Sequence, residues 1–105
     1  MTWEEFCKTE LGYEPKTTFW DDFSIADKFG DDAIKDTFQR AFNEWKNNYI
    51  YITELVMVLN HRGSYWYGRN SGRASLYWKL QAQADEYAVS HLQGEELDYY
   101  EQTLD

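Results

Sequence analysis

The sequence predicts an all-α protein, a compact single-domain bundle of five or six helices over residues 1–105. Apolar residues recur at intervals of three and four over most of the chain, and no stretch alternates convincingly as a strand would. Glycine and asparagine interrupt the periodic stretches only briefly. A chain of 105 residues, of which 19% are aromatic, can bury one core that is rich in rings.

Two helices are predicted before Gly30. The first, over residues 2–11, begins with capping-box spacing between Thr2 and Glu5. The second, over about residues 18–29, ends at Gly30, because glycine readily adopts the left-handed conformation that stops a helix. The apolar face of the second helix consists of Phe19, Phe23 and Ala26.

The clearest periodicity lies in the third predicted helix, about residues 33–47, for which Asp31 or Asp32 is the expected cap. Five apolar residues share one face of this helix: Ile34, Phe38, Ala41, Phe42 and Trp45. Burial of its three rings contributes about 1.5–3 kcal/mol each to stability. We therefore expect Phe42→Ala to be severely destabilising.

The fourth predicted helix covers about residues 49–62. Its β-branched residues also allow a strand, but the apolar spacing favours a helix. The residues that share its face are Ile52, Leu55, Val56 and Leu59. Three glycines then predict a loop over residues 63–72, although residues 65–67 could extend the helix as far as Gly68.

Two further helices are predicted at the carboxyl-terminal end. The fifth, about residues 73–92, has one face formed by Leu76, Leu80, Ala84, Tyr87, Ala88 and His91. Its position on this face predicts that His91 is semi-buried. A short terminal helix over residues 95–104 has one side formed by Leu97, Tyr100 and Leu104.

Charge is distributed unevenly along the chain, whose formal net charge is -9. Residues 1–54 carry 12 acids and 6 bases, residues 55–84 carry 4 bases and no acid, and residues 85–105 carry 7 acids and no base. Tyrosine and tryptophan residues lie among the bases of the middle segment, and we call residues 62–79 the basic aromatic band. Arg, Tyr and Trp dominate interface hot spots. The candidate partner-binding residues are Arg62, Tyr65, Trp66, Arg69, Arg73 and Lys79.

The basic aromatic band has two other interpretations. In the first, its rings pack the last helices together and its arginines pair with the acidic surface. In the second, the rings stack on nucleic-acid bases while Arg62, Arg69 and Arg73 contact phosphates. Four bases in a chain of net charge -9 argue against direct binding to nucleic acid.

No catalytic or metal centre is predicted. Cys7 has no second cysteine, and His61 and His91 have no second ligand at metal-binding spacing. If Glu54 is aligned as the last ligand of a calcium loop, Asn48 occupies the position that requires glycine. Paired acids near helix starts are explained by the helix dipole. We expect a protein that is not an enzyme and that needs no cofactor.

The sequence contains no segment that is expected to enter a membrane. The amino-terminal residues lack the basic start and apolar run of a signal peptide. The longest apolar stretch, residues 55–59, is far too short to span a bilayer. We expect a cytoplasmic protein, and a homodimer that covers exposed rings is a further possibility.

Several segments resemble a known group of proteins. They are TTFWDDFSIADKFG at residues 17–30, AIKDTF at 33–38, NEWK at 43–46, ADEYA at 84–88 and LQGEEL at 92–97. With these segments the chain resembles small uncharacterised proteins of Firmicutes mobile elements and prophages, over nearly its whole length. The resemblance implies an intracellular accessory protein of a mobile element, and it implies no catalytic residue.

Three functions from different classes follow from these observations. The first is a non-catalytic protein-interaction module that binds a protein partner through the basic aromatic band or through its acidic faces. The alternative is an acidic inhibitor that imitates nucleic acid and occupies the basic groove of a DNA- or RNA-binding protein. A small enzyme or a direct nucleic-acid binder has the least support.

Overall fold

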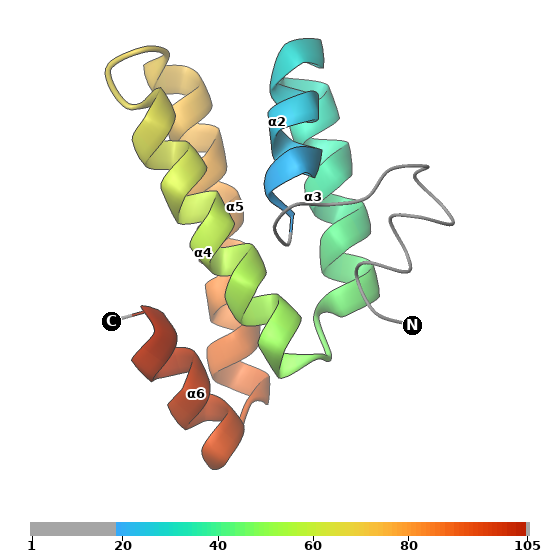
Figure 1. The fold of residues 1–105 in the computed structure, drawn as a ribbon, viewed down its shortest axis with the longest axis vertical. Helices are drawn as coiled ribbons and strands as arrows, with labels where there is room; N and C mark the ends of the chain where they lie inside the picture. The colour runs from blue at the N-terminus through green and yellow to red at the C-terminus, as the bar shows by residue number, and fades with distance from the viewer. Residues whose placement is uncertain (1–18, 105) are drawn as a thin grey trace.

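A computed structural model of the chain, which describes residues 19–104, confirms the all-α fold (Figure 1). Within this range the chain forms five helices and no strand. They are α2 (Trp20–Phe29), α3 (Asp31–Trp45), α4 (Tyr49–Trp66), α5 (Ser71–His91) and α6 (Glu95–Leu104). The helix predicted over residues 2–11, with Thr2, Glu5 and Cys7, lies outside the described residues. None of the described helices has the length and apolar character needed to cross a membrane.

The bundle consists of two helical hairpins and a terminal helix. Helices α2 and α3 form one hairpin, α4 and α5 form the other, and α6 packs against α4 (Figure 1). Tyr100 fixes α6 in place, since its ring is buried and its hydroxyl donates a hydrogen bond to the Asp85 carboxylate of α5. Burial, together with this bond and the charge of Asp85, raises the pKa of Tyr100 above its ordinary value.

A single residue, Gly30, joins α2 to α3. Its φ of 111° is a conformation that side chains other than glycine rarely adopt, so a glycine is required here. The expectation that Asp31 or Asp32 caps α3 is wrong, because Gly30 occupies the cap position and no side chain bonds there. Both aspartates lie in the first turn instead, where the helix dipole stabilises negative charge.

The predicted apolar faces of the first three described helices are buried. This is confirmed for every residue of the faces of α2, α3 and α4 named from the sequence. Ring contacts join the two hairpins: Phe23 lies 5.8 Å from Tyr77 and Phe42 lies 5.3 Å from Tyr87, both edge to face. The core therefore combines aromatic and aliphatic side chains, and its rings are shared by both hairpins.

The predicted face of α5 is only partly correct. Its buried residues are Ala74, Tyr77, Leu80, Ala84 and Ala88, whereas Leu76 and Tyr87 are only partly buried. The expectation of a semi-buried His91 is wrong, because its side chain is exposed and stacks on Tyr87 with ring centroids 3.8 Å apart. Because α5 contacts both α3 and α4, two neighbours together determine which residues are buried.

The loop predicted over residues 63–72 is shorter than expected. Helix α4 continues through Gly63 to Trp66, and only residues 67–70 connect it to α5. Gly63 packs against α5: a Cβ at this position would lie 2.2 Å from Nε1 of Trp78. This glycine therefore allows close helix packing and does not form a turn. The start of α5 is capped by Asn70, whose side chain accepts a hydrogen bond from the Arg73 amide at 3.1 Å.

Candidate interaction site at the α4–α5 turn

The structure brings together five of the six residues predicted to bind a partner. The last turns of α4, the connecting turn and the first turn of α5 carry Arg62, Tyr65, Trp66, Arg69 and Arg73. Lys79 lies farther along α5, about 9 Å from Arg73 along the helix axis, and is exposed. The candidate site is therefore the end of the α4–α5 hairpin, without Lys79.

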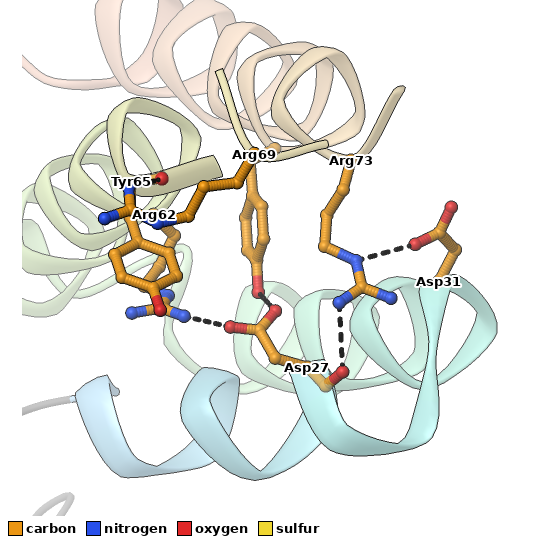
Figure 2. A network of polar contacts seen from close by, with 7 residues as sticks. Asp27, Asp31, Arg62, Tyr65, Arg69 and Arg73 are labelled. Atoms are coloured by element: carbon orange, nitrogen blue, oxygen red, sulfur yellow. Dashed lines mark hydrogen bonds and ion pairs between the residues drawn. The ribbon is translucent and has the colours of Figure 1, made fainter. Parts of the chain in front are cut away.

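Asp27 of α2 is the centre of a polar network beneath this site (Figure 2). Its carboxylate accepts hydrogen bonds from the guanidinium of Arg62, with which it forms an ion pair, and from the hydroxyl of Tyr77. Its main-chain carbonyl accepts a hydrogen bond from Nη1 of Arg73 at 3.0 Å. The Asp27 side chain is 7% exposed and that of Arg62 is 14% exposed, so the ion pair is largely screened from water.

Arg73 is also held by the fold. Its Nε lies 3.1 Å from Oδ1 of Asp31, and its guanidinium lies 4.6 Å from the centre of the Trp66 ring. The hydrogen bond and the stacking both orient the side chain along the surface of α2 and α3. For Arg62 and Arg73, the structure thus supports the interpretation in which the arginines pair with acids of the protein itself.

Tyr77 is part of the core as well as of the network. Its ring is fully buried against Phe23, and only its hydroxyl reaches Asp27. Burial is the main cause that raises the pKa of Tyr77 above its ordinary 10.0, and the hydrogen bond and charge of Asp27 add to it. Tyr77 therefore stays a hydrogen-bond donor at neutral pH.

Arg69 differs from the other two arginines. Its Nη1 donates a hydrogen bond to the main-chain carbonyl of Tyr65 at 2.6 Å, and its guanidinium lies 4.3 Å from the centre of the Tyr65 ring (Figure 2). Arg62 lies 4.5 Å from the same ring. Among residues 19–104, no carboxylate forms an ion pair with Arg69. The side chain is thus held in place, while no acid of the described residues forms an ion pair with it.

Two tyrosines next to Arg69 are exposed to solvent. Tyr65 is 45% exposed and Tyr67 is 69% exposed, and both are large rings for a surface position. Tyr67 packs on one side against Trp78, with ring centroids 5.7 Å apart. We call Tyr65, Tyr67 and Arg69 the turn surface. Tyr67 lies within the basic aromatic band but was not among the six residues predicted to bind a partner.

The turn surface has the chemistry of a contact site. A guanidinium and two phenol rings can bind a carboxylate and apolar groups, but they include no nucleophile with a base beside it. In the described part of the chain, no three histidine, cysteine, aspartate or glutamate side chains gather as metal ligands. The position of Asp27 beneath the site had no signal in the sequence, since 35 residues separate it from Arg62.

Comparison of the chain with protein families, with curated proteins and with solved structures gives no match.

Proposed function

We propose that the protein is a non-catalytic protein-interaction module that binds a protein partner through the turn surface. The observation that carries this proposal is the state of Arg69, which is fixed by the Tyr65 carbonyl and ring but has no acidic partner among the described residues. A side chain that is already ordered loses little conformational entropy on binding. Its charge is free to pair with a carboxylate of the partner.

The surroundings of Arg69 support the same role. Tyr67 presents a ring that is 69% exposed yet rests on Trp78, so it offers apolar area with little freedom to lose. Arg62 and Arg73 neutralise Asp27 and Asp31 and hold the turn against α2 and α3. The expected partner surface therefore combines an acidic group for Arg69 with an apolar patch for Tyr67.

The sequence resemblance provides a context for this role. We propose an accessory protein of a mobile element or prophage that acts in the cytoplasm by contact with another protein. The module needs no cofactor for this function.

Affinity capture from a nuclease-treated lysate of the source organism tests the proposal. The full-length protein serves as bait beside Arg69→Glu and Tyr67→Ser, and Lys79→Glu is the matched control because it reverses an exposed charge outside the turn surface. We expect the same partner on the wild type and on Lys79→Glu, and at least about tenfold less on the other two variants. Thermal denaturation of each bait confirms that all are folded.

Two results contradict the proposal. Equal loss of the partner from Lys79→Glu and Arg69→Glu shows that general charge, and not the turn surface, causes binding. In the second result, none of the three variants affects the complex, and the complex weakens steeply with salt. This result favours the acidic inhibitor that imitates nucleic acid.

A further inference from the structure

A groove of about 350 Å³ runs between α2 and α3, on elements that do not contribute to the turn surface. The α2 side is formed by Asp22, Ile25, Ala26 and Phe29. The α3 side is formed by Ala33, Asp36, Thr37 and Arg40, which have the same spacing along their helix. The intervals of three, four and seven residues mean that each helix presents one complete stripe to the groove. Two parallel stripes of this kind are the shape into which a third helix packs.

The depth of the groove comes from small side chains. Ala26 and Thr37 are buried at its base, whereas Phe29 at its edge is 78% exposed. Phe29 is the most exposed large hydrophobic side chain in the described part of the chain, and Ile25 beside it is also exposed. A partner that covers this ring would remove its apolar surface from water, which favours binding.

One wall of the groove carries the Asp22 carboxylate, and Arg40 on the other wall is close enough to act on its charge. Within residues 19–104, Asp22 accepts no side-chain hydrogen bond and forms no ion pair. Burial raises the pKa of the Asp22 carboxyl from 3.8 to about 6, against the opposing influence of the Arg40 charge. A cation placed beside Asp22 would stabilise the charged carboxylate that burial now disfavours.

The charge around the groove distinguishes among its possible occupants. Helices α2 and α3 together carry seven acids and three bases, and two of the acids, Asp27 and Asp31, pair with Arg62 and Arg73. The other five acids still outnumber the three bases, so a second copy of this chain would oppose like charges across the contact. Residues 1–18 carry four acids and two bases and have the same sign. A positively charged occupant is the one that fits.

We propose that the α2–α3 groove binds a basic amphipathic helix of a protein partner, which places an apolar side chain against Ile25 and Phe29 and a lysine or arginine beside Asp22. Since α2 contains ten residues, the bound helix covers about three turns. This binding site is independent of the turn surface, because none of its residues belongs to α4, α5 or the turn between them.

A synthetic peptide tests the groove directly. The probe is a fluorescein-labelled amphipathic helix of leucine, alanine and lysine, about 14 residues long, with a glutamate-for-lysine peptide as its negative control. Binding to the full-length protein is measured by fluorescence anisotropy, and amide NMR shifts locate the peptide. We expect the lysine peptide to bind, the glutamate peptide not to bind, and the shifts to fall on residues 22–40.

Matched variants separate the groove from general attraction to an acidic protein. Asp22→Asn and Phe29→Ser should each weaken binding at least about tenfold. Asp98→Asn and Val89→Ser remove the same kinds of group from exposed positions elsewhere, and they should change binding by less than about twofold. Arg69→Glu should leave peptide binding unchanged, so that failure of the turn surface and failure of the groove are distinguishable.

Three results overturn the proposal. Equal weakening by Asp22→Asn and Asp98→Asn, or shifts spread over α6, would show attraction to negative charge in general. Equal binding of both peptides would show that the groove does not select a cation. A homodimer that Phe29→Ser dissociates would show that a second copy covers this groove.

Discussion

Asp27 and Asp31 show that the same kind of ion pair contributes differently to stability in a buried and in an exposed environment. The Asp27 side chain is 7% exposed and bonds both Arg62 and Tyr77, whereas the Asp31 side chain is 52% exposed and, among residues 19–104, bonds Arg73. Removing one partner of a buried pair leaves an uncompensated charge, while water replaces the partner of an exposed one. Asp27 should therefore matter far more to stability.

We predict that Asp27→Asn lowers the free energy of unfolding by about 3 kcal/mol, because Arg62 keeps its charge in a largely buried position. Asp31→Asn makes the same chemical change at an exposed pair and should lower it by less than about 1 kcal/mol. Urea denaturation of both variants at pH 7 measures the difference. Similar losses for the two variants would show that the Asp27 network does not hold the hairpins together.

At the level of single residues, features set by local composition could be predicted from the sequence, but contacts between the hairpins could not. Tyr65 and Arg69 of the turn surface were recognisable, because local composition and charge identify them, whereas Tyr67 was not singled out. The pairing of Asp27 with Arg62 was not recognisable, because it depends on how two hairpins dock. The absence of an ion pair at Asp22 within residues 19–104 was not predictable for the same reason, since an acid near a helix start normally requires no further explanation.

At the scale of the helices, the end of α4 shows that a glycine can either form a turn or allow two helices to pack closely. The three glycines at positions 63, 68 and 72 predicted one long loop. The structure separates them: Gly63 lies inside α4 against Trp78, Gly68 has a φ of 89° in the turn, and Gly72 lies in the first turn of α5. Only the helix packed against Gly63 reveals its role, so the boundary of α4 could not follow from local pattern.

We predict opposite effects for two glycine-to-alanine substitutions in helices. Gly63→Ala should lower stability by about 1–2 kcal/mol, because its new methyl group must displace the Trp78 ring. Gly72→Ala should leave stability unchanged or raise it by up to about 1 kcal/mol, since its nearest neighbour would be Asn70 Oδ1 at an ordinary 3.5 Å. Melting temperatures of the two variants check this, and a stabilised Gly63→Ala would refute the packing role.

Helix faces were predictable where periodicity alone determined them. The stripe of α3 and that of α4 were correct because strong apolar residues repeat at helical spacing. In α5, Tyr77 turns inward with small alanines, and His91 at the end of the helix points out. The hydrophobic signal there is weak, and contact with both α3 and α4 decides the orientation.

At the scale of the whole molecule, the ring-rich core makes the two hairpins one cooperative unit. Phe42 illustrates this, because it stacks on Phe38 within α3 at 5.3 Å and meets Tyr87 of α5 edge to face. Lys46 also lies 5.6 Å above its ring. A change at Phe42 therefore affects packing within one hairpin and between both.

We predict that Phe42→Ala lowers the free energy of unfolding by about 3–5 kcal/mol, through lost burial and the cavity it leaves. Phe29→Ala deletes the same ring at a position that is 78% exposed and should change stability by less than about 0.5 kcal/mol. Chemical denaturation followed by circular dichroism measures both. An unchanged midpoint for Phe42→Ala would remove the α3 stripe from the core.

The two tyrosine–carboxylate bonds set an alkaline limit on the folded state. The folded chain holds the phenol protons of Tyr77 and Tyr100 more tightly than the unfolded chain, in which tyrosine ionises near 10.0. Stability from these groups is therefore intact below about pH 10 and falls as pH rises above it. An ultraviolet titration followed together with circular dichroism tests this prediction. The absorbance change from ionisation of Tyr77 and Tyr100, which are hydrogen-bonded to carboxylates, should occur only together with the loss of helix.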